Sequence, residues 1–314
     1  MRAAGSDDYW RSRAGVSAVK GVLAPSPGEP GVSPLPAIAD EQVETEAPVR
    51  LARHAASPAV ADFVRHFWVP RWRLPAGVVV EQGVLEYPSA NLVIDADAAA
   101  LYGPEPGRGR QRLEGTGWAF GVLLQPGVAR RLLARPVREV IGRSVPVEKL
   151  RVADAAAMTS RVRDAVARGD DEGACAVFES WLLAQRLELD DDARLVRRVV
   201  ELAETDRTVL RADDLARVSG LGLRSLQRLV REQLGLTPKW LIRRYRMQEA
   251  AAALASPTPP PLAELAASLG FTDQAHLTRE FRAVIGETPR RYARAARQAR
   301  VPGNSPLPFP DGPP

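Results

Sequence analysis

The chain has 314 residues, of which 45% are hydrophobic and 26% charged, values typical of a globular protein with room for two domains. Its single cysteine, Cys175, excludes an internal disulfide and a metal site built on paired cysteines, and is typical of a reducing cytosol. The sequence contains no run of about 18–20 apolar residues and begins without the apolar segment of a secretory signal. We therefore expect a cytoplasmic protein that does not enter a membrane.

The net charge of +5 is concentrated in the last third of the chain. Residues 191–300 carry 20 Lys and Arg against 13 Asp and Glu, a net charge of +7, whereas the remaining residues have a net charge of −2. Because a basic surface attracts polyanions, this asymmetry favours a nucleic-acid partner for the last third. Proteins that bind no nucleic acid can also be basic, so charge alone does not decide the function.

Both ends of the chain are rich in proline and glycine. Residues 1–48 include the stretch APSPGEPGVSPLP, and residues 299–314 form a similar tail. A segment of this composition has too few large apolar side chains to build a packed core. We predict that both segments are disordered.

Residues 49–147 contain short apolar runs bounded by turn residues, namely FVRHFWVP, GVVVEQGVLEYP, NLVIDA and GWAFGVLLQPG. Such runs predict strands. After Pro146 the apolar spacing becomes helical, which predicts trailing helices over 147–187. Residues 49–190 are therefore expected to form a β-rich sensor or dimerisation domain. The acidic stretch that follows Leu187 is the predicted linker, with Asp191 or Asp192 as the N-cap of the next helix.

The N-terminal half offers four aromatic residues as candidates for an apolar ligand pocket: Trp68, Trp72, Tyr87 and Trp118. The alternative is that each is an ordinary core or surface residue. His54 and His66 are too few and wrongly spaced for a cupin-like metal site, and Cys175, within ACAVF, is predicted to be a buried apolar side chain. The sequence contains no Walker loop, HExxH or GxSxG motif. We expect no cofactor, no metal and no enzymatic activity.

Two stretches in the last third share one pattern. Residues 212–234 and 262–285 each contain a short helix with Leu-Ala, a glycine-containing turn and a longer helix that ends at Gly followed by Thr-Pro. A repeat of about 50 residues with this internal turn predicts two helix-turn-helix units. Residues 238–254 between them read as one long helix with Pro238 in its first turn.

An α-helix fits the major groove of B-DNA, where each base pair presents its own pattern of donors and acceptors. The second helix of each unit therefore supplies the candidate base-reading residues, with a solvated helix face as the alternative. Thr272 is the predicted N-cap of the second of these helices. The linker-helix arginines are candidates for phosphate contacts, and solvation is again the alternative. The base-reading candidates are Arg224, Gln227, Arg228, Arg231, Gln274, Ala275, His276 and Arg279, and the phosphate candidates are Arg243, Arg244 and Arg246.

Residues 191–298 resemble the DNA-binding domain of the AraC/XylS family. The matching positions are Leu215-Ala216, Leu226 to Leu229, Gly235 to Pro238, Arg246-Met247, Ala250, Leu265-Ala266, Leu269 to Arg282, Gly286, Thr288-Pro289 and Tyr292. Two positions depart from the family: Gly222 stands where a helix-capping Ser or Thr is usual, and Val230 where Phe is frequent. Upstream, YPSANLVID, FGVLLQPGVARRLL and GRSVPVEKL resemble a sensor domain found before some AraC-type domains.

The resemblance implies an α+β protein: a β-rich N-terminal domain with trailing helices, then an all-α domain of two helix-turn-helix units joined by a long linker helix. It implies a transcription factor that binds double-stranded DNA in sequence-specific fashion. A small-molecule effector, RNA polymerase and a second copy of the chain are further expected partners. Two alternatives stay open: a DNA-targeted repair or modifying enzyme, and a partner-docking regulator without a small-molecule ligand.

Overall fold

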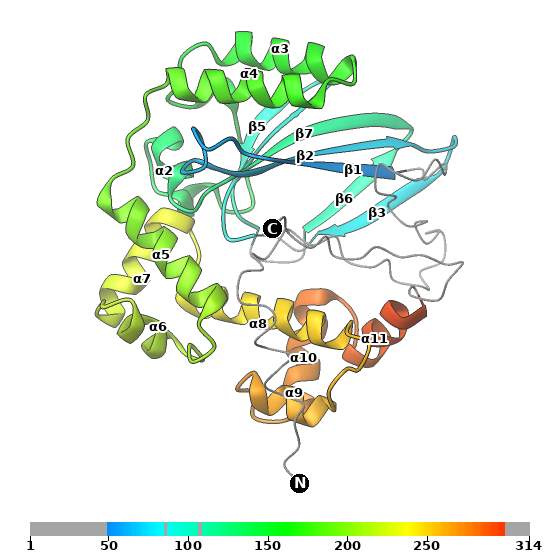
Figure 1. Ribbon diagram of the computed structural model, residues 1–314, viewed down its shortest axis with the longest axis vertical. Coiled ribbons are helices and arrows are strands. Elements are labelled where there is room, and N and C mark those ends of the chain that lie inside the picture. The colour runs from blue at the N-terminus through cyan, green and yellow to red at the C-terminus, as the bar shows by residue number, and fades with distance from the viewer. Residues whose placement is uncertain (1–48, 85–86, 106–108, 299–314) are drawn as a thin grey trace.

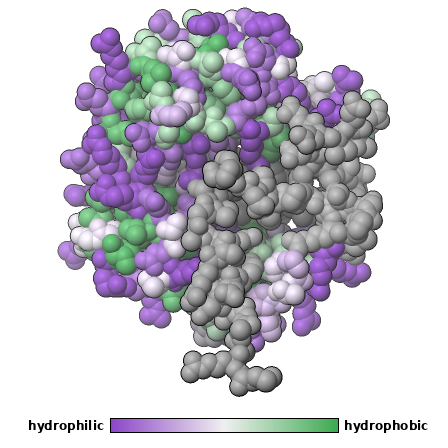
Figure 2. Space-filling view, in the orientation of Figure 1, coloured by the Kyte–Doolittle hydropathy of each residue, from purple (hydrophilic) through white to green (hydrophobic). Residues whose placement is uncertain are grey.

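The computed structural model describes residues 49–84, 87–105 and 109–298 (Figure 1). The disorder predicted for residues 1–48 and 299–314 concerns segments outside the described residues. Within the described part, strands occupy the first half and helices the second, so the predicted α+β class is confirmed. In the view of Figure 2, hydrophilic side chains cover much of the outer rim of the molecule.

The N-terminal domain is built on a six-stranded antiparallel sheet. Its strands, in spatial order, are β1 (Val49–Ala55), β2 (Val64–Arg73), β7 (Thr116–Leu124), β4 (Asn91–Asp95), β5 (Ala99–Tyr102) and β8 (Ser144–Pro146). A separate antiparallel pair consists of β3 (Val79–Val84) and β6 (Gly109–Glu114). The four apolar runs contain β2, β3, β4 and β7 as predicted. Sequence reasoning did not separate out β1, β5, β6 and β8.

Two helices, α3 (Ala155–Ala167) and α4 (Asp171–Ala184), cover one face of this sheet (Figure 1). Successive side chains of a strand point to opposite faces, and Phe67, Phe120 and Val122 point to the covered face with no exposed surface. The ring of Phe67 lies 5.7 Å from that of Phe120 and 5.9 Å from that of Phe178 on α4. This cluster forms the centre of the N-terminal core.

An ion pair fixes the start of α4 to the sheet. Arg71 on β2 donates to both carboxylate oxygens of Asp171, at 2.9 and 2.7 Å, and to the carbonyl oxygen of Val166 at 3.0 Å. His54 on β1 lies 3.6 Å from the same carboxylate. The bidentate geometry sets both the position and the angle of the helix.

On the opposite face of the sheet, two tryptophan side chains each pack against a glycine of the neighbouring strand. A Cβ atom at Gly121 would lie 1.9 Å from Cε2 of Trp68, and one at Gly117 would lie 2.4 Å from Cζ2 of Trp72. Both indoles therefore lie close against the β7 backbone, which only glycine permits. The Trp68 indole N–H donates to the side-chain oxygen of Asn91 at 3.2 Å.

Between the linker and residue 298, where the described part of the chain ends, there are seven α-helices. They are α5 (Asp191–Thr205), α6 (Ala212–Val218), α7 (Leu223–Leu234), α8 (Pro238–Leu254), α9 (Leu262–Ser268), α10 (Gln274–Ile285) and α11 (Pro289–Gln298). The first unit consists of α6 and α7 and the second of α9 and α10. Each unit has its own hydrophobic core, and α8 contributes residues to both. The linker helix spans residues 238–254 as predicted from the sequence.

Two N-caps differ from the sequence-based expectation by one residue. Asp190, not Asp191 or Asp192, caps α5 by accepting from the Ala193 N–H at 2.8 Å. Asp273, not Thr272, caps α10 by accepting from the His276 N–H at 2.6 Å. In both cases the capping aspartate has an extended backbone conformation, from which its side chain reaches the N–H of the third helical residue.

The N-terminal domain packs directly on the first unit. A short helix, α2 (Val128–Leu133), and two 3-10 turns, η1 (Val137–Val140) and η2 (Val147–Lys149), follow β7, and α2 and η1 both contact α7. Gly235, which ends α7 with φ 71°, lies under Ile141: an added Cβ would be 2.5 Å from its Cδ1 atom. A larger residue at position 235 would be strained at this positive φ and would displace the Ile141 side chain.

Removing the central ring of the N-terminal core tests its contribution to stability. We expect Phe67→Ala to lower the free energy of unfolding by about 3–5 kcal/mol, because the ring is fully buried against two others. Urea unfolding followed by circular dichroism measures the change. Tyr102→Ala is the control, because Tyr102 is 41% exposed; an equal loss in both variants would contradict this assignment of the core.

The two N-caps of the helix-turn-helix units predict changes of opposite sign. Gly222 caps α7 without a side-chain hydrogen bond, has φ −69°, and a Cβ there would meet no atom within 4 Å. Gly222→Ser should therefore stabilise the chain by a few tenths of a kcal/mol, whereas Asp273→Ala should destabilise it by about 1 kcal/mol. Thermal unfolding measures both, and a destabilising Gly222→Ser or a neutral Asp273→Ala would contradict the cap assignment.

Candidate nucleic-acid interface

The two units have the same backbone geometry at the turn. Gly220 and Gly270 both have φ 70°, in the left-handed region that favours glycine. The residue after each glycine closes the turn with the same bond: the Leu221 N–H donates to the Ala216 carbonyl and the Phe271 N–H to the Ala266 carbonyl, each at 2.9 Å. The sequence repeat is thus a structural repeat.

The helices of the two units also match. The first helix has 7 residues in each unit and the second has 12. Both second helices end at a left-handed glycine, Gly235 or Gly286, whose N–H donates to the carbonyl of an arginine four residues earlier. Since the two second helices have equal length and equivalent ends, they present equivalent surfaces.

In the first unit, α7 separates apolar and polar faces. Leu226, Leu229 and Val230 are buried in the unit's core. The predicted reading residues occupy the other face, and all are exposed: Arg224, Gln227, Arg228 and Arg231. They recur at intervals of three and four residues and so form one stripe of a helix.

In the second unit, three of the four predicted residues are exposed on α10: Gln274, Ala275 and Arg279. His276 is half-buried. Its ring meets the Phe271 ring edge-on at 5.2 Å, and its Nδ1 lies 3.4 Å from the Thr272 hydroxyl oxygen. The histidine therefore lies in the first turn of α10 and packs against the turn that precedes the helix.

The three linker-helix arginines do not share one exposed surface. Arg243 forms an ion pair with Glu280 on α10. Arg244 is only 4% exposed, so the expected phosphate contact is corrected: a buried guanidinium cannot reach the DNA backbone. Arg246 is half-buried and donates to the Val209 carbonyl at 3.3 Å. The sequence run RRYR gave no means to distinguish these three environments.

The four aromatic residues proposed for a ligand pocket do not lie together. Trp68 and Trp72 lie on the sheet face away from α3 and α4, whereas Trp118 packs against the core on the covered face. Tyr87 belongs to the core of the first helix-turn-helix unit and is 1% exposed. The four residues therefore do not share one location: strand alternation places Trp118 on the face opposite to Trp68 and Trp72, and Tyr87 lies in the core of the first unit.

Tyr87 belongs instead to a polar contact between the two domains. Arg65 on β2 donates to the Tyr87 hydroxyl, which lies 3.3 Å from Glu204 on α5, and Arg65 itself lies 3.4 Å from Glu204. The Tyr87 ring meets that of Tyr245 on α8 edge-on at 6.4 Å. Burial raises the pKa of Tyr87 to about 12, so the phenol stays protonated at neutral pH. Sequence reasoning missed Arg65, Glu204 and Tyr245.

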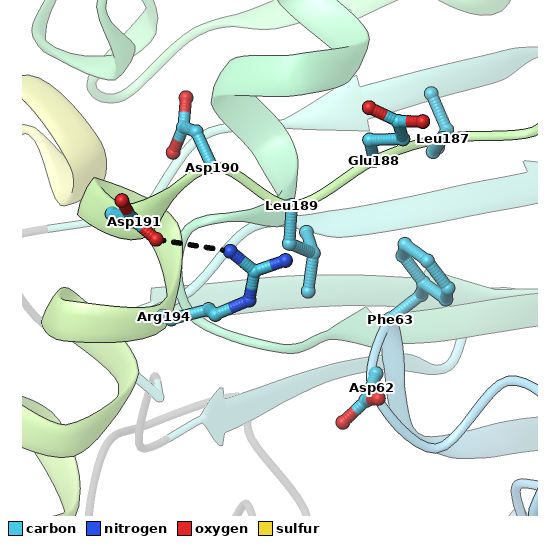
Figure 3. Close-up of a pocket in the computed structure, with 8 residues that line it drawn as sticks. All are labelled: Asp62, Phe63, Leu187, Glu188, Leu189, Asp190, Asp191 and Arg194. Atoms are coloured by element: carbon cyan, nitrogen blue, oxygen red, sulfur yellow. Dashed lines mark hydrogen bonds and ion pairs between the residues drawn. The ribbon is translucent and has the colours of Figure 1, made fainter.

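An open groove of about 650 Å³ lies at the junction of the domains (Figure 3). It is lined by the β1–β2 loop, the linker and the first turn of α5, and Arg194 there forms an ion pair with Asp191 at 3.1 Å. Four of its lining residues carry carboxylates, which repel phosphate, so this groove does not suit a nucleic-acid backbone. The lining residues are Asp62, Phe63, Leu187, Glu188, Leu189, Asp190, Asp191 and Arg194.

Cys175 is buried on α4, in agreement with the expectation of an apolar role. Burial raises the pKa of its thiol to about 12, which keeps it protonated and unreactive. Among the described residues there is no group of three or more His, Cys, Asp or Glu able to hold a metal ion. None of the described helices is long and apolar enough to cross a membrane.

Two family models match the chain. One, described as a helix-turn-helix domain, matches residues 215–295, and the other, described as a domain of unknown function, matches residues 52–146. No curated protein matches the chain.

Several solved structures are similar to parts of the chain. A transcriptional regulator from Chromobacterium violaceum is 25% identical over 33% of this chain and 94% of its own, with a TM-score of 0.31. A probable AraC family regulator from Rhodopseudomonas palustris is 27% identical over 34% of this chain and 99% of its own, with a TM-score of 0.29. Apo ToxT from Vibrio cholerae is 11% identical over 81% of this chain and 100% of its own, with a TM-score of 0.35.

The matched residues 215–295 cover most of the first unit, the linker helix and all of the second unit. The motif positions quoted from the sequence lie within these helices and at the turns between them. The C-terminal domain of this chain thus matches a helix-turn-helix family model, and the domain before it matches a domain of unknown function.

Proposed function

We propose that the protein is a transcription regulator that places α7 and α10 in two successive major-groove segments of double-stranded DNA. The observation that carries this proposal is the repeat itself: two units of equal geometry, each with an exposed polar face on its second helix. Successive major-groove segments on one face of B-DNA lie about 34 Å apart. One chain with two reading helices suits such a site.

The proposed roles follow from the side-chain chemistry. Arg228 and Arg279 each donate a bidentate pair of hydrogen bonds to guanine, and Gln227 and Gln274 form bidentate hydrogen bonds with adenine. Ala275 contacts a thymine methyl group. His276 holds the turn of the second unit at the DNA surface through Phe271 and Thr272. Arg224 and Arg231 flank Arg228 on the same stripe and extend the contact along the groove.

Selection of duplexes from a random pool, followed by titration of variants, tests the reading residues. We expect Arg228→Ala and Arg279→Ala each to weaken binding to the selected duplex by about 1–3 kcal/mol and to relax base preference in one half of it. Weak binding to unrelated DNA should persist, because phosphate contacts supply it.

The matched control for both variants is Arg161→Ala, which removes the same charge from an exposed position on α3. It should bind the selected duplex as the wild type does. Wild-type affinity and base preference in both Arg228→Ala and Arg279→Ala would contradict the proposed reading faces.

We further propose that the N-terminal domain controls the first unit in response to a small molecule. The contact of Arg65, Tyr87 and Glu204 joins β2 to α5, and Tyr245 extends it to α8. Trp68 and Trp72 lie on the same strand as Arg65, so a ligand held on that face of the sheet would move the strand that carries the contact. Such coupling requires the ligand to bind one arrangement of the domains better than the other.

Breaking this contact tests whether it holds the domains together. Arg65 and Glu204 have side chains only 15% and 10% exposed, so Arg65→Met leaves a largely buried carboxylate without its cation, which costs about 3 kcal/mol. We expect faster amide hydrogen exchange in α5 and in β2 of the full chain. Arg112→Met breaks an exposed pair with Glu114, 67% and 61% exposed, and should leave exchange there unchanged. Unchanged protection of α5 in Arg65→Met would contradict the proposed contact.

A further inference from the structure

The cores of the two helix-turn-helix units divide at one residue of the linker helix. The last α8 residues in the core of the first unit are Ile242 and Tyr245, and the core of the second unit begins at Met247. Arg246 stands between them, near the middle of α8. It belongs to neither core, although its side chain is half-buried.

The Arg246 side chain contacts both units. Its Nη2 donates to the carbonyl oxygen of Val209, in the segment that leads into the first unit, at 3.3 Å. Its guanidinium carbon lies 6.0 Å from the centre of the Phe271 ring, in the turn of the second unit. A Cβ atom at Gly270, in that same turn, would lie 3.5 Å from its Nη1. One side chain therefore bridges the entry of the first unit and the turn of the second.

Two further contacts close the same junction. Leu210, 38% exposed, reaches across to the turn of the second unit, where a Cβ at Gly270 would lie 3.2 Å from its Cδ1. Arg207 pairs with Glu249 at 3.4 Å, which ties the segment before α6 to the next turn of α8. The segment from Arg207 to Leu210 is thus held against both the linker helix and the second unit.

The electrostatics fit a guanidinium fixed in this position. Burial lowers the pKa of Arg246 from its ordinary value, and the nearby carboxylates of Glu249 and Asp214 act in the opposite direction. An arginine can donate to a carbonyl while its flat group lies over an aromatic ring, whereas the compact ammonium of lysine cannot do both.

From these contacts we propose that Arg246 is a positioning residue that fixes the angle between the two reading helices and so sets the half-site spacing that the protein accepts. The proposal rests on the proposed function, because it concerns how two DNA-reading units act together. It replaces the phosphate contact expected for Arg246 from the sequence.

We call these contacts of Arg246 the brace between the two units. The geometry of DNA explains why such a brace would affect binding. Inserting one base pair between two half-sites rotates one against the other by about 34–36° and moves it by about 3.4 Å. A protein whose two units are held at one angle cannot follow that rotation. Without the Arg246 contacts the units are joined only through α8, and their relative angle can adjust. Spacing selectivity is therefore the property that Arg246 should control, and base preference within each half-site is not.

The test uses the full chain and the duplex that the wild type selects from a random pool. Affinity is measured for that duplex, for derivatives with one or two base pairs inserted or removed between the half-sites, and for a duplex with one half-site only. The variants are Arg246→Met and Arg246→Lys, with Arg161→Ala on α3 as the control for loss of one positive charge. The salt dependence of binding is measured for each.

We expect the wild type to lose about tenfold or more in affinity when one base pair is inserted, the order of a mismatched base pair. In Arg246→Met the difference between spacings should fall to about threefold or less. Its affinity for the single half-site and its salt dependence should match the wild type. Arg246→Lys should behave like Arg246→Met, since lysine retains the charge without the bridge.

Two results would overturn the proposal. One is a uniform loss of affinity at every spacing in Arg246→Met, with the salt slope reduced by about one and binding restored in Arg246→Lys, because a phosphate contact behaves in this way. The other is an unchanged spacing profile in Arg246→Met.

If Arg246→Met does not fold, Leu210→Ala decides, with Leu183→Ala, at a 48% exposed leucine of α4, as its control. A broadened spacing profile in Leu210→Ala supports the brace, and a wild-type profile overturns it. Failure of the wild type to select any duplex would instead contradict the proposed function.

Discussion

The structure of the DNA-binding domain depends on one helix that belongs to two hydrophobic cores. The first half of α8 packs into the core of the first unit and the second half into that of the second. A helix of 17 residues is about 25 Å long, and because a sharp kink would interrupt its backbone hydrogen bonds it acts as a stiff spacer. Because each end is buried in a different unit, a large rotation of either unit about the helix would expose apolar surface, which leaves the contacts of Arg246 to set the finer angle. The pairing of α7 and α10 is a consequence of this shared burial.

The N-terminal domain adds an asymmetric constraint. It contacts the first unit through α2 and η1 against α7, through Gly235 under Ile141, and through the polar cluster of Arg65, Tyr87 and Glu204. The second unit is held through α8 and the junction around Arg246. Movement of the N-terminal domain would therefore act first on α7. Any effect on α10 would follow through the linker helix.

The sequence was most informative where a local physical rule acts alone. Thr237 and Pro238 mark the start of α8, since a threonine N-cap followed by proline satisfies the first turn, and both the start and the end of that helix were predicted correctly. The glycine turns located both units because only a left-handed residue fits there. The repeat then identified α7 and α10 as equivalent helices.

Contacts between segments far apart in the sequence could not be predicted. Arg243, Arg244 and Arg246 lie within four residues, and only the packing of α8 against two units makes one ion-paired, one buried and one bridging. Tyr87 was grouped with three tryptophans as an aromatic residue, but its hydroxyl meets Glu204 more than 100 positions later. Thr272 and Asp273 are both acceptable N-caps, and only the backbone shows which carries the extended conformation.

We propose that one chain reads two half-sites on one face of the duplex at a fixed separation. Hydroxyl-radical footprinting of the full chain on its selected duplex measures this directly at single-nucleotide resolution. We expect two protected windows on the same face of the duplex, about one helical turn apart. A single continuous window, or two windows on opposite faces of the duplex, would contradict it.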